Sequence, residues 1–358
     1  MASRFLRKDL NSFSPYSVTY YPDFIKLDAN ESPFELPDEV REEIKRQFSK
    51  LSLRIYPDPS VLELRKSIAS FLDIEGLTEE NIAVGNGSDE LLQYIFIAFP
   101  NREDTVLYPN LSFEMFPVLS RIAGVKDISL EVNDSLELET QSVIDAFYQC
   151  KPRLFLICRP NNPTGWAISR EGLLKILEDA KRNDILVVID EAYSEFMKES
   201  LSCLIKEYDN IIILRTFSKA FSLAGLRLGY AVSNREIIND LMAVKLPYNV
   251  DIFSQMVGRI VLKYKDMILP RVEEIIKERN RLYESLSRLS GVRVFPSDAN
   301  FLFFYCEDES LMDRLLSYKI KIRKFEPRHP LLKNAYRITV GRREDNDRFI
   351  FAMEEILT

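Results

Sequence analysis

Apolar residues follow a helical spacing in some segments of the chain and form short unbroken runs in others. The runs LVVID and IIILR are apolar on both faces, which favours buried parallel strands over half-exposed antiparallel ones. Ser60 is the expected N-cap of one of the helices. The helical spacing predicts helices over 37–51, 60–72, 91–99, 169–182 and 265–290.

Strands and helices alternate along the middle of the chain, which predicts an α/β sheet with crossover helices. We expect one of these helices directly after the strand in NIIILRTFSK. The strands are expected in DTVLYP, KDISLEV, RLFLICRP, ILVVIDEAY, NIIILRTFSK and LGYAVS.

The C-terminal part has a different pattern, in which short strands are interleaved with helices over 308–317 and 344–357. The strands are expected in VRVFP, ANFLFFY, KIKIRKF and YRITVG. With 358 residues the chain exceeds the usual size of a single core, so one large and one smaller domain are expected. We expect an N-terminal arm over 1–35, a large domain over 36–262 and a small α+β domain over 263–358.

Composition and charge exclude several classes of protein. The chain is 46% hydrophobic and 29% charged, which is typical of a globular protein, and its net charge of −7 argues against a nucleic-acid surface. No apolar run reaches the ~18 residues of a membrane span, and MASRFLRKDL lacks the apolar core of a signal peptide. Four dispersed cysteines indicate free thiols. We therefore expect a cytoplasmic protein that binds neither nucleic acid nor membrane.

A single histidine, His329, is present. A histidine-rich metal site or an imidazole-centred triad is thereby disfavoured, and no metal is expected. Proton transfer would then depend on Lys, Asp, Glu or Tyr, or on a bound cofactor.

Two motifs at predicted loops could bind an anion and a polar ring. In GNGSDE (85–90), glycines free the backbone while Ser88 and Asp89 expose amides at a helix N-terminus, which suits phosphate. A capped glycine turn is the alternative. In RPNNPTG, Pro163 keeps Asn162 extended so that its amide can point at a ligand, although an Asn-Pro turn has the same sequence.

Two further motifs carry charges at strand ends. Asp190 ends the apolar run VVID, where a carboxylate needs a partner unless it only caps a turn. Lys219 follows IIILRTFS and could attack an aldehyde if its pKa is lowered; otherwise it is a surface lysine. Arg227 offers a fork for phosphate. Together these motifs require a ligand with a phosphate, an aldehyde and a ring nitrogen. Pyridoxal 5′-phosphate meets all three requirements.

The motifs GNGSDELL, PNNPTG, VVIDEAY and TFSKAFSLAGLRLGY, in this order, resemble pyridoxal-phosphate aminotransferases of fold type I, classes I and II. The segments LDANESPF, RIYPDP, PSDANF and RITVGRREDND further resemble the histidinol-phosphate aminotransferase family. The resemblance covers nearly the whole chain. It implies a three-layer α/β/α large domain with a mostly parallel central sheet, and a homodimer with shared active sites. It also implies transamination between L-histidinol phosphate and 2-oxoglutarate in histidine biosynthesis.

The resemblance also implies roles for individual residues. Lys219 would bind the cofactor covalently and move a proton, while Asp190 would pair with the pyridine nitrogen. Asn162 and Tyr193 would hydrogen-bond the ring oxygen, and Phe113 would stack on the ring. The cofactor phosphate would be held by Ser88, Asp89, Ser218 and Arg227, with Tyr56 from the neighbouring subunit. Asn30 and Arg337 would face the substrate.

Two departures from the family pattern leave the identity of the substrate open. Phe113 stands where tyrosine is common in the family. The second substrate arginine usually lies thirteen residues before the position of Arg337, where this chain has Lys324; Arg323 fits only with one extra residue. An aromatic amino acid aminotransferase and a threonine-phosphate decarboxylase-like enzyme are the rival enzymes. A cofactor-binding domain of a regulator and a nucleotide-binding protein are disfavoured, the latter because GxGxxG and GxxxxGK[ST] are absent.

Overall fold

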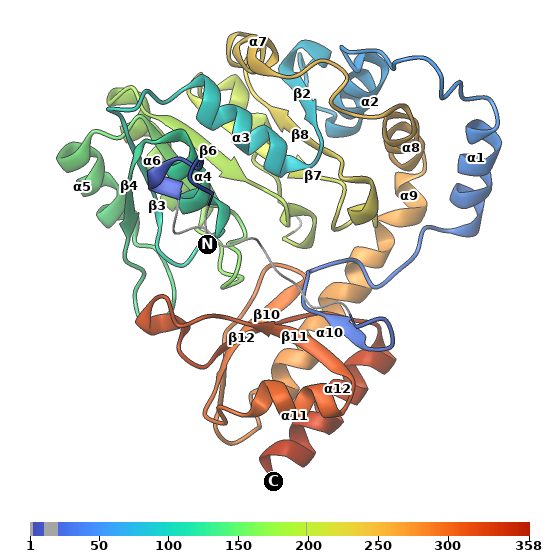
Figure 1. The fold of residues 1–358 in the computed structure, drawn as a ribbon, viewed down its shortest axis with the longest axis vertical. Helices are drawn as coiled ribbons and strands as arrows, with labels where there is room; N and C mark the ends of the chain where they lie inside the picture. The colour runs from blue at the N-terminus through green and yellow to red at the C-terminus, as the bar shows by residue number, and fades with distance from the viewer. Residues whose placement is uncertain (1–2, 11–20, 198) are drawn as a thin grey trace.

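The computed structural model describes residues 3–10, 21–197 and 199–358, and their strands form two sheets (Figure 1). The larger sheet has seven strands in the order β2-β8-β7-β6-β5-β3-β4. All its pairings are parallel except those of β8, which runs antiparallel to β2 and β7. The strands are β2 (Ile82–Gly85), β3 (Thr105–Pro109), β4 (Lys126–Leu130), β5 (Leu154–Cys158), β6 (Leu186–Asp190), β7 (Ile211–Thr216) and β8 (Gly229–Val232).

Helices cover both faces of this sheet and make three layers, as expected. One face packs against α2 (Leu62–Leu72), α5 (Thr140–Cys150), α6 (Arg170–Arg182) and α8 (Ile252–Lys263). The other face packs against α3 (Ser88–Ala98), α4 (Met115–Ala123) and α7 (Arg235–Val244). Side-chain caps begin several of these helices, because Ser169, Asn234 and Asp251 each accept a hydrogen bond from a first-turn N–H.

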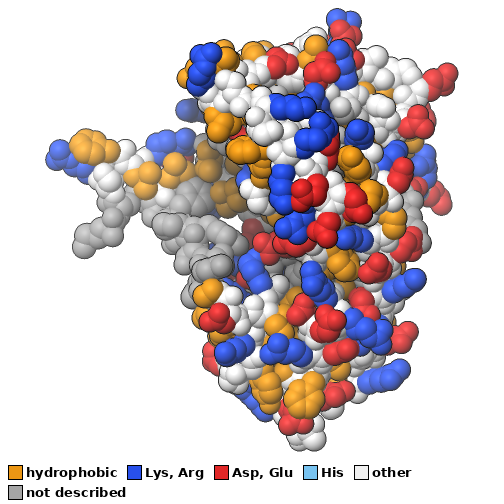
Figure 2. Space-filling model, turned by 90° about the vertical axis from the view of Figure 1, so that its right-hand side faces the viewer, with side chains coloured by type: hydrophobic (Ala, Val, Ile, Leu, Met, Phe, Trp, Pro, Cys, Tyr) orange, Lys and Arg blue, Asp and Glu red, His pale blue; other side chains and the backbone are white. Residues whose placement is uncertain are grey.

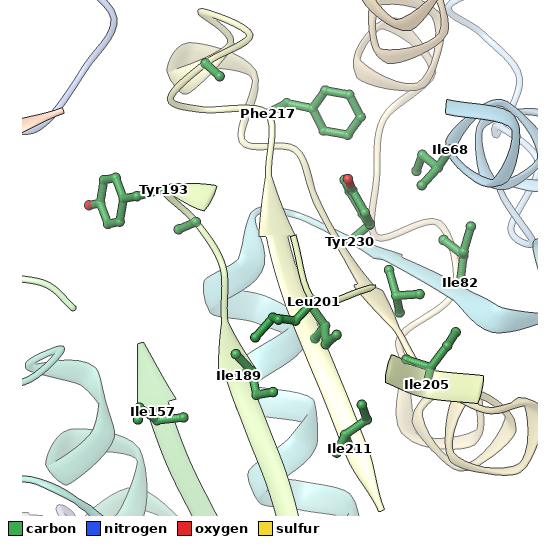
Figure 3. Packing of buried hydrophobic residues seen from close by; sticks show 14 of the residues in the cluster. Ile68, Ile82, Ile157, Ile189, Tyr193, Leu201, Ile205, Ile211, Phe217 and Tyr230 are labelled. Atoms are coloured by element: carbon green, nitrogen blue, oxygen red, sulfur yellow. The ribbon is translucent and has the colours of Figure 1, made fainter. Parts of the chain in front are cut away.

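Every residue of β5, β6 and β7 is buried. Their side chains alternate between the two layers, so Ile157, Ile189 and Ile211 lie on one face (Figure 3) while Cys158 and Val188 lie on the other. Burial on both faces explains the unbroken apolar runs in the sequence.

The smaller sheet has the order β1-β11-β12-β10-β9. β1 pairs parallel with β11, and the other pairings are antiparallel. Its strands are β1 (Ile25–Leu27), β9 (Val292–Val294), β10 (Phe301–Cys306), β11 (Ile320–Lys324) and β12 (Ala335–Thr339). One face is covered by α10 (Pro270–Leu286), α11 (Leu311–Ser317) and α12 (Arg343–Leu357).

Three features join the two sheets. The helix α10 runs from the larger part of the molecule along the smaller one (Figure 1). On the face of the small sheet that points away from these helices, Phe303 and Phe325 pack against Leu111, which follows β3. β1 adds the N-terminal part of the chain to the small sheet. We propose the division into 1–35, 36–262 and 263–358 on this basis; residues 1–2 and 11–20 of the arm lie outside the described residues.

Three expectations about helices were wrong in detail. Ser60 does not cap α2; Asp58 accepts the N–H of Leu62 instead. Only a short 3-10 turn, η5 (Ala224–Leu226), follows Lys219, because Ser222 and Arg227 adopt positive φ. The helix expected over 265–290 is divided into α9 (Lys265–Ile268) and α10 by Pro270, which lacks an N–H. The remaining predicted helix near the N-terminus is α1 (Asp38–Phe48).

The surface carries mixed charges. On the face in Figure 2, Lys and Arg side chains are interspersed with Asp and Glu. No helix among the described residues is long and apolar enough to cross a membrane.

Gly229 provides a test of how closely β8 packs on the turn before α3. A Cβ at this position would lie 2.4 Å from the backbone N of Ser88 and 2.6 Å from the backbone C of Gly87. Because backbone must move, we expect Gly229→Ala to lower the free energy of unfolding by about 1–3 kcal/mol in urea titrations. The control Gly225→Ala meets no atom within 4 Å and should change it by less than about 0.5 kcal/mol. Equal effects of the two substitutions would contradict this packing.

Candidate functional site

The site is built where parallel strands end. β5, β6 and β7 are adjacent, so their carboxyl ends meet at one edge of the sheet. The chain continues from these ends into Asn162, Asp190 and Lys219, and ligands of open α/β sheets bind at such an edge. Three of the predicted site residues are therefore neighbours because of the strand order.

Asp190 is the last residue of β6, and only 8% of it is exposed. Its Oδ1 accepts the N–H of Ala192 at 3.0 Å. Burial raises its pKa to about 7, the charges of Asp89 and Glu191 add to the rise, and Lys219 opposes it. A carboxylate with this proton affinity is suited to pair with a protonated ring nitrogen.

Lys219 extends into the same space from the turn after β7. Its Nζ donates to the carbonyl oxygen of Ala29 at 3.0 Å and lies 5.8 Å from the centre of the Tyr193 ring. Burial, helped by the charge of Arg337, lowers its pKa to about 8. A larger fraction of the amine is therefore neutral near physiological pH than for an ordinary lysine, and the neutral form is the one that acts as nucleophile and proton acceptor.

Residues of the small sheet, and of the segment that follows its strand β1, also reach this edge of the large sheet. The hydroxyl of Tyr193 accepts a hydrogen bond from Asn30 Nδ2 at 3.0 Å, and Asn30 also donates its backbone N–H to Thr339 Oγ1 at 2.8 Å. Arg337 of β12 donates to Asn162 Oδ1 at 2.5 Å and to the carbonyl oxygen of Asp28 at 2.8 Å. The structure thus brings Asn30, Asn162, Tyr193 and Arg337 together.

A second group of predicted residues forms a turn suited to phosphate. The helix α3 begins at Ser88 after Gly87, whose φ is 83°. Arg227 lies over this turn and pairs with Asp89 at 3.0 Å, and a Cβ at Gly87 would meet Arg227 Nη2 at 2.8 Å. Ser218 is buried beside Thr216, which donates to its hydroxyl at 2.9 Å. These N–H and guanidinium groups converge as a phosphate cradle does.

Phe113 and Arg323 lie at the boundary between the two sheets. Phe113 is half-buried and packs edge to face on Phe116, with ring centres 5.9 Å apart. The residue after it, Glu114, pairs with Arg323 at 3.3 Å.

The register of β11 and β12 separates Arg323 from Lys324. Arg323 lies directly opposite Arg337, whereas Lys324 lies opposite Tyr336. Lys324 donates to the carbonyl oxygen of Glu309 at 3.2 Å, on the face away from Arg337. The geometry favours Arg323, not Lys324, as the second cation on the Arg337 face.

Tyr56 is not among the residues that the chain brings together. Its side chain is 77% exposed and stacks on Tyr248, with ring centres 4.5 Å apart. Its expected contact with the cofactor phosphate of a neighbouring subunit stays a prediction.

Comparisons with known proteins show the family of the chain. The family model described as "Aminotransferase class I and II" matches residues 22–353. A histidinol-phosphate aminotransferase from Caldanaerobacter subterraneus is 41% identical over 361 residues, which cover 100% of both chains. The chain belongs to the class I and II aminotransferases.

Solved structures share the fold of this aminotransferase. The histidinol-phosphate aminotransferase from Clostridium acetobutylicum has a TM-score of 0.84 and 26% identity, over 93% of this chain and 98% of that one. The enzyme of the same name from Sinorhizobium meliloti, solved in complex with pyridoxal-5′-phosphate, has a TM-score of 0.87 at 23% identity, over 99% and 98%. At this identity the second likeness establishes the fold alone.

The aminotransferase residues fit pyridoxal phosphate, the cofactor of the family. A buried carboxylate with a raised pKa, an amine with a lowered pKa and an arginine over a helix N-terminus match its ring nitrogen, aldehyde and phosphate. The described residues include no group of three or more His, Cys, Asp or Glu that could hold a metal ion.

Sequence reasoning missed several groups that support the site. Asp28 and Ala29 act through their carbonyl oxygens, for which no side-chain signal exists. Asn300, in the PSDANF motif, is fully buried and donates to the carbonyl oxygen of Asn30 at 3.1 Å. The sequence signal that could have identified Asn300 is a polar residue between two apolar ones, Ala299 and Phe301.

The raised pKa of Asp190 predicts a pH-dependent cost to stability. Above about pH 7 the folded protein holds a buried carboxylate, whereas the unfolded chain ionises near 3.8. In the protein without cofactor, Asp190→Asn should therefore increase the free energy of unfolding by up to about 4 kcal/mol at about pH 8. The gain should shrink as the pH falls through the window from 7 to 4.

Urea titrations across this pH range measure the effect. The control Asp38→Asn alters a carboxylate that is 92% exposed and should change stability by about 0.5 kcal/mol or less. A gain from Asp190→Asn that did not vary with pH would show that its carboxylate carries no such penalty.

Proposed function

We propose that this protein is a pyridoxal-phosphate-dependent aminotransferase that transfers the amino group of L-histidinol phosphate to 2-oxoglutarate, in histidine biosynthesis. The observation that carries the proposal is the register of β11 and β12, which places two arginines, Arg323 and Arg337, at directly opposite positions on one face of the sheet. Like charges opposite each other in a sheet repel, so this arrangement suits an anionic substrate group. The name of the similar Caldanaerobacter enzyme supports the choice of amino donor.

The cofactor would be held by groups at or after the ends of five strands, β2, β3, β5, β6 and β7. Asp190 would pair with its ring nitrogen, Asn162 and Tyr193 would bind its ring oxygen, and Phe113 would cover its ring. Its phosphate would be held by Ser218, Arg227 and the N–H groups at Ser88 and Asp89. When bound, pyridoxal phosphate supplies an aldehyde for the amino group and a ring that withdraws electrons from the substrate carbon.

Lys219 would perform the proton transfer. Because its pKa is lowered to about 8, Nζ can take a proton from the substrate carbon that bears the amino group and return one later. The hydrogen bond from Nζ to the carbonyl oxygen of Ala29 directs the amine toward the Tyr193 ring. No histidine is needed for this chemistry.

Arg337 and Arg323 would orient the substrate from the opposite side. The phosphate of histidinol phosphate and a carboxylate of 2-oxoglutarate are both anions, so the two half-reactions can use the same cations. Arg337 is held in place by Asn162 and by the carbonyl oxygen of Asp28. A bidentate guanidinium held in this way restricts the pose of the substrate.

We also propose that the enzyme is a cytoplasmic homodimer in which Tyr56 reaches the cofactor phosphate of the partner. The support is an exposed apolar group around the stacked Tyr56 and Tyr248 rings, which includes Leu53, Ile55 and Leu246. Exposed apolar side chains gathered in this way are typical of an interface.

Turnover of alternative amino donors tests the proposed function. With 2-oxoglutarate as acceptor, kcat/KM for L-histidinol phosphate should exceed that for phenylalanine or tyrosine by at least about a hundredfold, because the single carboxylate of those donors carries less charge than a phosphate and makes fewer contacts to the two arginines. Production of glutamate, measured with a coupled assay, reports transfer.

The Lys219→Ala variant is the control for this assay, and it should lose turnover. A preference for phenylalanine or tyrosine would favour the aromatic aminotransferase. Release of carbon dioxide from threonine phosphate without formation of glutamate would show that the enzyme is a decarboxylase and not a transaminase.

Arg323 and Lys324 can be distinguished by matched substitutions. Loss of a charge-assisted contact to phosphate should make Arg323→Ala raise KM for histidinol phosphate by about 10- to 100-fold. Lys324→Ala, on the other face of β11, should change KM by less than about threefold. The reverse ranking in steady-state kinetics would mean that the register does not identify the substrate-binding cation.

A further inference from the structure

A charged cluster lies buried behind the strand ends that carry the site. Arg215 of β7 pairs with Glu195 at 2.6 Å and lies 3.9 Å from Glu191. The exposed fractions of the three side chains are 6%, 9% and 0%. We name Glu191, Glu195 and Arg215 the Arg215 cluster.

The Arg215 cluster also binds the loop that follows. The carboxylate of Glu191 accepts hydrogen bonds from the N–H of Leu201 at 2.7 Å and from the hydroxyl of Ser200 at 2.9 Å. Arg215 donates to the same hydroxyl at 3.1 Å. Each cluster member is therefore held by hydrogen bonds in addition to charge.

The cluster lies on the opposite face of the sheet from Asp190. Side chains alternate along β7, so Arg215 shares a face with Ile211 and Ile213, while Leu214 lies on the face of Cys158. Figure 3 shows this environment: Leu201 and Tyr230 lie on the face that carries Ile189 and Ile211. Arg215 lies on this face and Asp190 on the other, so the cluster can influence Asp190 through the backbone and through the charge of Glu191, which adds to the rise in the pKa of Asp190.

Stability alone is a poor reason for such a cluster. Buried charges lose their hydration, and apolar replacements of similar volume are often at least as stable. Here the cost is visible, because neither Arg215 Nε nor the hydroxyl of Tyr230 has a hydrogen-bond partner among the described residues. A net excess of one carboxylate in an apolar layer adds to it.

The positions of the cluster along the chain indicate another role. Glu191 directly follows Asp190, Glu195 is two residues after Tyr193, and Arg215 is four residues before Lys219. One guanidinium thus joins the turn that carries Asp190 and Tyr193 to the strand that leads to Lys219.

We propose that Arg215, with Glu191 and Glu195, positions Asp190 and Tyr193 relative to Lys219, and this inference rests on the function proposed above. The three are positioning residues, since none reaches the reacting groups. A misplacement of about 1 Å between such groups can cost on the order of a hundredfold in rate. The alternative is that the cluster only holds the Ser200–Leu201 turn, in which case its removal would leave the reaction unaffected.

A neutral variant tests the proposal. Glu191→Gln, Glu195→Gln and Arg215→Met together remove all three charges and leave none of them buried and unpaired, so the melting temperature should stay near that of the wild type. Without cofactor, amide hydrogen exchange over residues 190–196 should accelerate at least about tenfold. With cofactor, kcat should fall at least about tenfold while KM changes by less than about threefold.

The matched control is another arginine between two carboxylates. Arg281 pairs with Glu278 at 2.6 Å and with Asp347 at 2.7 Å, next to the small sheet. Its neutral counterpart, Arg281→Met with Glu278→Gln and Asp347→Asn, should leave kcat and the exchange of 190–196 unchanged. An equal fall of kcat in both variants would overturn the proposal.

The exchange measurement separates this inference from the proposed function. It needs neither cofactor nor substrate, so exchange that stays at the wild-type rate in the neutral variant overturns the positioning role whatever the enzyme transfers. Absence of wild-type transamination overturns the proposed function without altering that measurement. If the neutral variant does not fold, Arg215→Lys decides: it keeps the charge but loses the fork, so kcat should fall about three- to tenfold, and wild-type kcat would overturn the proposal.

Discussion

The structure depends on one electrostatic constraint: a carboxylate and an amine must both remain available at the buried edge of a sheet. Burial penalises the charged form of each, raising the pKa of Asp190 to about 7 and lowering that of Lys219 to about 8. These values are useful because they fall near physiological pH, where both protons can move. Parallel strands covered on both faces create the burial, so the fold and the chemistry share one cause.

The small sheet contributes to the same edge through polar contacts. Arg337 reaches Asn162, and Asn30 reaches Tyr193, so hydrogen bonds join the two parts of the chain where the reactive groups lie. The apolar contact of Phe303 and Phe325 with Leu111 lies beside them. Packing thus brings the two sheets together, and directional hydrogen bonds align them. A substrate that binds Arg337 would therefore contact a residue that is hydrogen-bonded to both parts of the chain.

The sequence predicted most of the large sheet, and it singled out most of the residues that gather at its edge, because both have local signals. Strands buried on both faces are unbroken apolar runs, and Asp190 and Lys219 stand where such runs end. The sequence left the choice between Arg323 and Lys324 open, because spacing along the chain does not show which of the two shares a face with Arg337; that depends on the register of β11 and β12. The carbonyl oxygens of Asp28 and Ala29 left no signal, since any residue provides one. The 3-10 turn after Lys219 depends on positive φ at Ser222 and Arg227, residues that carry no such preference.

The sequence motifs that contain the proposed reactive residues also contain the residues that we propose to position them. In VVIDEAY, Asp190 faces the site and Glu191 faces the opposite layer; in IIILRTFSK, Lys219 follows a strand whose Arg215 faces that same layer. Strand alternation explains the first case, because the residue next to Asp190 lies on the other face, and it places Arg215 on the face of Ile211 and Ile213. An enzyme that needs fixed side chains at a strand end can therefore hold the backbone that carries them by contacts on the opposite face of the sheet. A charged cluster suits this purpose better than apolar packing, because hydrogen bonds constrain direction as well as distance.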